Sequence, residues 1–356
     1  MRTPAPVRAV LLALTAVLVA AGCGAVEPAP RPNRSAPVIW PEGYTEPAVH
    51  SPPVRACPDP GRSLSPAGLE QVRTPTLNRI RNEDKRFVVG VSQTAPLFSR
   101  RDLATGELVG FEVDIVRRIA RELFGEPLQP DDSRLRLVTM PTGSRLFAVD
   151  TAKNREARKQ RPELGELPNL DMVIADVSIT CGRVDTYGLR YSAPYLTTTT
   201  GLMVRTGDHH GVNSPDDLGG RKICSGTATT NSDEMIEFRD RQRAAGKSEV
   251  VPVSVNDTSE CLMLLQRGLV DAIYTDVLIL EGFRLQDPTT VLLDYRAPST
   301  GEAGIAFSDE DQDLVRFVNG VLDRMRADGS LAAAYEKWFG TVPGRKPIPA
   351  SRYLDP

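Results

Sequence analysis

The sequence is poor in histidine and has almost no excess of charge. It has three histidines, His50 and the adjacent pair His209 and His210, and none is spaced from carboxylates or cysteines as metal ligands are. The formal net charge is −3, and no basic run is present. These absences argue against a nucleic-acid partner and against a metal site. Neither a metal nor a cofactor is expected.

Long apolar runs are also missing, except at the start of the chain. Arg2 and Arg8 precede the run Ala9–Ala21, which fits the apolar core of a signal peptide but is too short to span a membrane. The run ends in Val19–Cys23, which is similar to a bacterial lipobox. We therefore expect a signal peptide over 1–22 and a lipid on Cys23. The alternative is a plain secreted protein that is cleaved near the same point.

The stretch that follows Cys23 is rich in proline. Eleven prolines lie between Gly24 and Glu70, without apolar periodicity. Such a composition predicts an extended tether between the lipid and the folded body. Cys57 indicates that the far end of this tether is attached to the body.

From residue 76 onward, strand and helix patterns alternate. The apolar run Phe87–Val91 predicts a buried strand, and Phe111–Phe124 has the apolar spacing of a helix. Alternation of this kind indicates parallel sheets covered on both faces, an α/β fold. Further strands are expected at 135–138, 172–175, 202–204, 222–224, 250–255, 272–274, 291–294 and 304–307. Further helices are expected at 233–243, 259–267, 277–285, 314–325 and 331–339.

These elements divide into two α/β units. Extended crossings near Leu196–Thr200 and Asp294–Pro298 would join the units and leave a cleft between them. A cleft of this kind is the usual place for a small ligand. The expected division is a tether over 23–75, lobe 1 over 76–197 plus 298–342, lobe 2 over 198–297 and a tail over 343–356.

Four cysteines remain after Cys23, and an even number outside the cytoplasm favours two disulfides. Their number alone allows three pairings. Since Cys224 and Cys261 fall in one expected lobe and Cys181 in the other, we expect the pairs Cys224–Cys261 and Cys57–Cys181.

Six stretches of the chain match motifs of one known family, in the same order. They are Gly106–Ile115, Ser178–Arg183, Tyr191–Tyr195, Leu218–Thr227, Leu265–Ala272 with Asp276, and Tyr335–Trp338. They resemble the extracellular solute-binding proteins of family 3, which serve polar amino-acid transport. One substitution within a motif is Glu112, where the family usually has aspartate. The resemblance implies a type II periplasmic-binding fold, and the tether and cysteines are similar to those of actinobacterial glutamine- or glutamate-binding lipoproteins.

The resemblance implies the following roles in the cleft. Arg183 would hold the α-carboxylate of an amino acid through its planar fork, helped by Ser178. Asp276 would accept from the α-ammonium group, together with the carbonyl of Asp176. The side chain of Asp176 is unusual at a position that is often small, and could instead form a salt bridge with a nearby arginine.

A second contact to the α-carboxylate is expected from the turn Ser225–Thr229, just before a predicted helix. Amides at a helix N-terminus favour an anion. Because Ala228 adds one residue to the family's pattern, the contact could be made by Thr227 or by Thr229.

Selectivity for the ligand side chain is expected from Thr142, Arg145 and Ser92. In relatives that prefer acidic amino acids, the positions of Thr142 and Arg145 hold the distal carboxylate, although an arginine at position 145 is also widespread. Ser92, at the end of the first strand, suits an amide as well. The expected ligands are glutamate or aspartate first, then glutamine or asparagine.

The resulting prediction is a monomeric, extracytoplasmic, lipid-anchored binding protein that delivers its amino acid to an ABC permease. One alternative is a sensor that signals to a membrane partner when it closes. A dehydratase-like enzyme on the same fold is a weaker alternative, because the expected cleft is rich in Arg, Ser and Thr, which suits static anion binding. No catalytic residue is expected.

Overall fold

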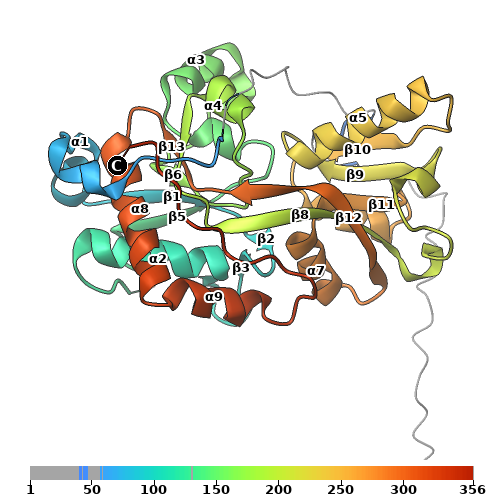
Figure 1. Cartoon of the computed structure of the whole chain (residues 1–356). Helices are drawn as coiled ribbons and strands as arrows, with labels where there is room; N and C mark the ends of the chain where they lie inside the picture. The colour runs from blue at the N-terminus through green and yellow to red at the C-terminus, as the bar shows by residue number, and fades with distance from the viewer. Residues whose placement is uncertain (1–39, 42, 47–56, 58, 130, 356) are drawn as a thin grey trace, which may run out of the picture.

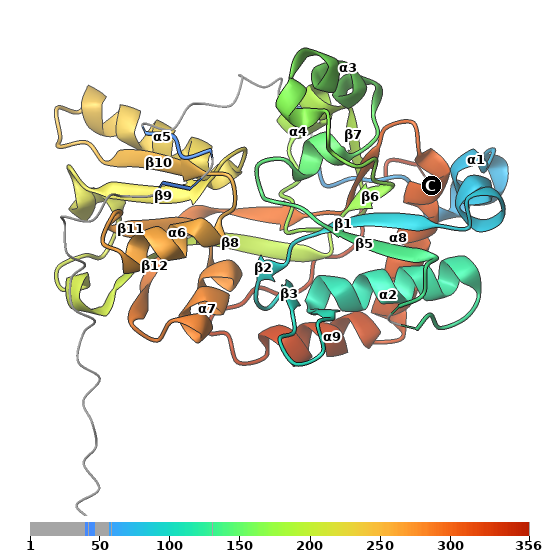
Figure 2. The same ribbon diagram turned by 180° about the vertical axis from the view of Figure 1, so that it is seen from behind.

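The computed structural model describes residues 40–41, 43–46, 57, 59–129 and 131–355. Two five-stranded sheets form separate lobes (Figure 1). In the first lobe α3 and α4 lie on one side of the sheet and α2, α8 and α9 on the other, and in the second lobe α5 and α7 lie on opposite sides (Figures 1 and 2). The predicted signal peptide, lipobox Cys23 and His50 lie outside the described residues.

The first sheet has the order β5-β1-β6-β13-β7, with β1 parallel to both of its neighbours and β13 antiparallel to both of its own. Its strands are β5 (Leu135–Thr139), β1 (Phe87–Val91), β6 (Met172–Val173), β13 (Ala306–Ser308) and β7 (Leu189–Tyr191). A small sheet beside it contains β2 (Thr94–Ala95), β3 (Ser99–Arg101) and β4 (Leu108–Val109).

The second sheet has the order β10-β9-β11-β8-β12, with β10, β9 and β11 parallel. Its strands are β10 (Val251–Val255), β9 (Lys222–Gly226), β11 (Ala272–Asp276), β8 (Leu196–Arg205) and β12 (Thr290–Ala303). The α-helices are α1 (Pro75–Asn78), α2 (Phe111–Phe124), α3 (Ala152–Gln160), α4 (Cys181–Tyr187), α5 (Thr230–Ala244), α6 (Ser259–Gln266), α7 (Val277–Gln286), α8 (Gln312–Ala327) and α9 (Ser330–Phe339).

Helix α2 has the bounds that its apolar spacing predicts, and its apolar face is fully buried. Gly110 precedes the helix with φ 149°, and a Cβ there would lie 2.1 Å from the carbonyl oxygen of Phe98. Only glycine fits this approach. Asp114 in the first turn accepts from Lys337 and Trp338, which joins α2 to α9.

The two crossings form one antiparallel ribbon between the lobes (Figure 1). Leu196–Thr199 of β8 pair with Thr300–Ala303 of β12. The first crossing is where the sequence predicts it, but the prediction for the second, 294–298, is wrong by several residues. Arg296 still pairs with Gly201 inside the second sheet, because irregularities in register lengthen β12 before it leaves that sheet.

The segment that precedes residue 76 is not simply a tether. Ser63, Leu64 and Ser65 are buried, and Ser63 pairs with Tyr353 of the C-terminal tail. The prediction that this stretch stays unpacked is wrong here, because Leu64 contributes to the core and Asn319 of α8 donates hydrogen bonds to the Ser63 hydroxyl and to the Leu64 carbonyl. Farther upstream, Thr45 forms an antiparallel bridge with Ser254 at the edge of the second sheet.

Both disulfides have the expected pairing. Cys224–Cys261 joins β9 to α6 within the second lobe, and Cys57–Cys181 joins the N-terminal segment to the first residue of α4. Among the described residues, no helix is long and apolar enough to cross a membrane, and no group of three or more His, Cys, Asp or Glu could hold a metal ion.

Candidate functional site

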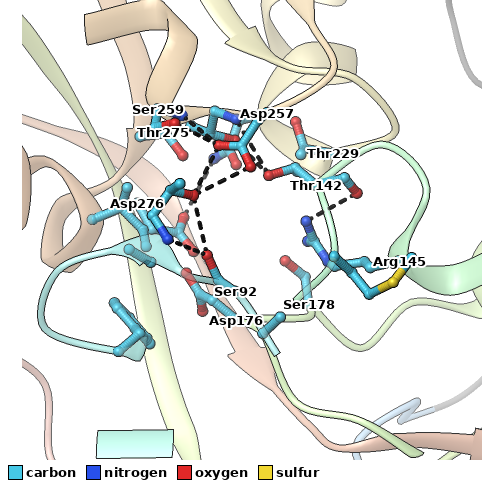
Figure 3. Close-up of a pocket in the computed structure, with 18 of the residues that line it drawn as sticks. Ser92, Thr142, Arg145, Asp176, Ser178, Thr229, Asp257, Ser259, Thr275 and Asp276 are labelled. Atoms are coloured by element: carbon cyan, nitrogen blue, oxygen red, sulfur yellow. Dashed lines mark hydrogen bonds between the residues drawn. The ribbon is translucent and has the colours of Figure 1, made fainter. Parts of the chain in front are cut away.

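A pocket lies between the two lobes, where strands of both sheets end (Figure 3). Ser92 follows β1, Asp257 follows β10, and Asp276 is the last residue of β11. The carboxyl ends of parallel strands commonly form ligand sites in open α/β sheets. Eight of the nine predicted binding residues line this pocket: Ser92, Thr142, Arg145, Asp176, Ser178, Arg183, Thr229 and Asp276.

Hydrogen bonds between the lobes hold the walls of this pocket together. Gly143 N donates to Asn256 O over 2.8 Å, and the hydroxyls of Thr142 and Thr258 lie 3.1 Å apart. The Thr94 hydroxyl donates to Asp257 over 3.0 Å. The structure therefore shows the lobes closed on each other.

Arg183 projects from the first turn of α4, whose N-cap is Thr180. Its Nη1 donates to Ser178 O over 2.7 Å and its Nη2 to Ala228 O over 2.9 Å, so it joins the two lobes. The residue is only 7% exposed, and no carboxylate of the described chain forms an ion pair with it. A buried guanidinium without a carboxylate partner is well suited to hold an anion.

Arg145 is the second buried arginine of the pocket, in the short 3₁₀ helix Arg145–Ala148. Its Nη1 donates to Thr142 O over 3.1 Å, while its Nε is buried without a hydrogen-bond partner. Burial, followed by repulsion from Arg183, lowers the pKa of Arg145 to about 10. Both effects penalise its charge, and a bound anion would relieve them.

The two candidate threonines in the turn before α5, Thr227 and Thr229, have different surroundings. Thr229 lines the pocket and caps α5: its hydroxyl donates to Gly226 O over 2.6 Å and accepts from Ser232 N over 3.1 Å. Thr227 does not line the pocket, and its buried hydroxyl has no hydrogen-bond partner. Ala228, between them, has a left-handed φ of 57°, which turns the chain at the inserted residue.

Asp276 is 6% exposed, and its Oδ1 accepts from Asn231 over 3.3 Å. Asp176 lines the same pocket. Burial, and then the charge of Asp276, raise the pKa of Asp176 well above its usual value. The predicted alternative of an Asp176–arginine salt bridge is wrong: none is present among the described residues, although the charge of Arg145 acts on the Asp176 carboxyl group.

Glu112 is a pocket residue that sequence reasoning noticed only as a substitution. It is fully buried, and its Oε1 accepts from Asp176 N over 2.6 Å and from the Tyr195 hydroxyl over 2.5 Å. Burial raises its pKa to about 7. Its longer side chain supports the backbone that presents Asp176 to the pocket.

Asp257 was not predicted, although it lies only two residues after the end of β10, much as Ser92 lies directly after β1. Its carboxylate accepts from the hydroxyl of Thr94 and from both the amide and the hydroxyl of Ser259. Apolar side chains complete the pocket wall: Phe98, Met140, Ile279 and Phe283.

Two lobes joined by a ribbon, with a polar pocket between them, define a type II periplasmic-binding fold. An ancestral arginine-binding protein, solved with arginine bound, has this fold with a TM-score of 0.57 and 26% identity, over 72% of this chain and 99% of that one. The ancestral protein AncCDT-1, described as a precursor of cyclohexadienyl dehydratase, is similar in fold with a TM-score of 0.58 and 23% identity, over 74% and 99%.

The model of the bacterial extracellular solute-binding proteins, family 3, matches residues 165–341 of this chain. The chain is 29% identical to the L-cystine-binding protein TcyJ of Escherichia coli, over 74% of this chain and 86% of the relative. It is 26% identical to the glutamine-binding protein GlnH of Bacillus subtilis, over 75% and 86%. It is 31% identical to the glutamate-binding protein GluB of Corynebacterium glutamicum, over 48% and 56%. These relatives are binding proteins and not enzymes.

Proposed function

We propose that this protein captures a polar L-amino acid outside the cytoplasm by closing its two lobes, and delivers it to an ABC permease. Glutamate or aspartate is the first choice of ligand, and glutamine or asparagine the second. The observation that carries the proposal is that Arg145 and Arg183 are both buried in one pocket and that neither forms a salt bridge with a carboxylate of the described residues. A ligand with two carboxylates would supply both partners.

The proposed α-carboxylate contacts come from both lobes. Arg183 and the Ser178 hydroxyl approach from the first lobe, and the N-terminal turn of α5 at Thr229 from the second. A ligand held in this way joins the lobes, as the Ser178–Thr230 hydroxyl contact of 3.3 Å already does. Binding and closure are then the same event.

The proposed acceptor for the α-ammonium group is the carboxyl pair of Asp276 and Asp176, which lies in the same pocket. An ammonium group offers three hydrogen-bond donors and a positive charge, so it suits carboxylates that form no salt bridge with an arginine or lysine of the described residues.

The rest of the pocket wall is proposed to contact the side chain of the ligand. Arg145, with Thr142, offers donors to a distal carboxylate. Asp257 and Ser92 lie in the same pocket, and a carboxylate at Asp257 could accept from a distal amide. This combination supports acidic ligands first and their amides second. The relatives agree only on the class, since by name they bind cystine, glutamine, glutamate and arginine.

The membrane anchor is part of the proposal, with a lipid on Cys23. The substitution Cys23→Ser should release the protein from the membrane fraction into the medium. Retention of that variant would contradict the anchor. Crosslinking in cells would then distinguish a permease from the alternative of a membrane sensor.

A thermal scan of residues 24–356 against each of the twenty L-amino acids tests the function. At about 100 times the dissociation constant, a ligand stabilises the folded state by about 2.7 kcal/mol, which raises Tm by several degrees. We expect this response for glutamate, aspartate, glutamine or asparagine. If no amino acid moves the transition, the proposed function is wrong. If amino acids outside this group are the ones that respond, only the substrate order is wrong.

A further inference from the structure

The loop that follows β10 directly, residues 256–258, makes hydrogen bonds to the first lobe, and we call it the closing loop. Its first residue, Asn256, accepts through its carbonyl oxygen from the amide of Gly143 over 2.8 Å. Its second residue, Asp257, accepts from the Thr94 hydroxyl over 3.0 Å and also lines the pocket. The lobes can make these bonds only while the closing loop keeps its position.

A segment far upstream, residues 43–46, lies against the outer side of β10, and we call it the docked segment. The Thr45 amide donates to Ser254 O over 2.9 Å, and the Ser254 amide donates to Thr45 O over 3.0 Å. Gly43 lies against the closing loop itself, because a Cβ at Gly43 would lie 3.2 Å from Asn256 Cβ. The edge strand of a sheet has unpaired backbone groups, so it accepts an added strand of this kind.

Side chains hold the docked segment in the same place. Lys222 of β9, the strand next to β10, has its Nζ 2.7 Å from Glu46 Oε2 and 5.8 Å from the centroid of the Trp40 ring. The Tyr44 hydroxyl donates to the same carboxylate over 2.5 Å, and the Tyr44 ring packs against the apolar core. The docked segment is therefore fixed by a salt bridge and an aromatic contact as well as by backbone bonds.

We propose that the docked segment positions the closing loop, so that affinity for the amino acid depends on residues that do not touch it. This inference rests on the proposed function, because it requires that the ligand is held by closure of the lobes. None of residues 43–46 lines the pocket, so their effect must pass through the closing loop. Thr45 acts by fixing the backbone of β10 at Ser254, and Gly43 acts by contact with Asn256.

Release of the ligand is the step that this arrangement should slow. The hydrogen bonds from the closing loop to the first lobe form when the lobes close, so they stabilise the closed complex and not the first encounter with the open protein. Loss of the docked segment should therefore raise the dissociation rate constant and leave the association rate constant nearly unchanged.

Thr45→Pro and Thr45→Ala are the matched pair of variants, made in residues 24–356. Proline removes the amide that donates to Ser254 O, whereas alanine keeps both backbone bonds. Stopped-flow measurements with L-glutamate, and with L-glutamine in parallel, give both rate constants. We expect Thr45→Pro to raise the dissociation rate constant by about tenfold, and Thr45→Ala to stay within about twofold of wild type.

A charge exchange tests the same docking without a proline. Lys222→Glu places a carboxylate against Glu46 and should raise the dissociation rate constant by about threefold, and Glu46→Lys in the same chain should restore it. Hydrogen exchange at the Gly143 amide adds a direct report on the closing loop. At saturating L-glutamate this amide should exchange faster in Thr45→Pro and in Lys222→Glu than in wild type.

The other outcomes overturn the inference. If Thr45→Pro releases the amino acid no faster than Thr45→Ala, the docked segment does not position the closing loop, and the proposed function stands because the wild type still binds. A slower association with unchanged dissociation would place the effect on the open protein. If Thr45→Pro does not fold, Lys222→Glu decides, and failure of Glu46→Lys to restore slow release would assign the effect to β9 alone. Failure of the wild type to bind any amino acid overturns the proposed function as well.

Discussion

Arg183 of the first lobe donates through Nη2 to the carbonyl oxygen of Ala228 in the second lobe, over 2.9 Å. The same guanidinium donates to Ser178 O in its own lobe over 2.7 Å. One buried cation thus touches both sides of the cleft that it is proposed to close. Closure and recognition of the α-carboxylate depend on the same side chain.

Arg183→Ala should raise the dissociation constant for L-glutamate by about 100-fold or more, since it removes charge-assisted hydrogen bonds in a buried site. Arg183→Lys should recover only part of the loss, because an ammonium lacks the planar fork. The control is Arg221→Ala, which removes an exposed arginine far from the pocket wall and should bind normally. Calorimetry measures all three, and unchanged affinity in Arg183→Ala would contradict the proposed carboxylate contact.

Arg145 and Asp257 should set the preference between acid and amide side chains. Arg145→Gln should weaken L-glutamate more than L-glutamine, by about tenfold in the ratio of their dissociation constants. Asp257→Asn should shift that ratio in the opposite direction, because it removes a negative charge near the distal carboxylate. Competition titrations give the ratios directly. If a variant changed the affinities for L-glutamate and L-glutamine by the same factor, the substituted residue would not contact the ligand side chain.

Glu112 should make stability depend on pH. Its pKa is raised to about 7 by burial, so between about pH 4.5 and 7 the folded state binds more protons than the unfolded state. Stability should therefore fall as the pH rises through this window, and Glu112→Gln should reduce the fall by up to about 3 kcal/mol. Urea unfolding of both proteins at pH 5 and pH 8 measures the difference. If the free energy of unfolding changed equally in both proteins between pH 5 and pH 8, Glu112 would be ionised at both pH values.

The disulfide Cys224–Cys261 should stabilise the second lobe without taking part in binding. Replacing both cysteines with serine should lower the free energy of unfolding by about 2–4 kcal/mol, because the unfolded chain gains freedom. Neither cysteine lines the pocket, so the affinity for L-glutamate measured below the transition should stay within about threefold of wild type. A large loss of affinity would mean that the bond also positions the turn at Thr229.

Local pattern was sufficient for most of the elements and for the site residues that end a strand. The run Phe87–Val91 and the helix Phe111–Phe124 have their predicted bounds, because burial of one periodic face dominates their energetics. Strand ends and family motifs predict Ser92, Arg183 and Asp276 as site residues, and all three line one pocket in the structure. The same reasoning, extended to the second residue after β10, would have found Asp257.

Long-range packing decided the rest. Ser63 pairs with Tyr353, and Leu64 beside it is buried. The paired residues lie far apart in the sequence, so no local pattern encodes this packing. Thr229 lines the pocket and Thr227 does not, and the left-handed residue Ala228 lies between them. Asp176 and Asp276 line one pocket only because the two lobes, to which they belong, close on each other. By itself, the sequence determined which polar residues stand at strand ends and in the motifs, and the tertiary structure decided which of them line one pocket, because side chains distant in sequence meet only when folding brings them together.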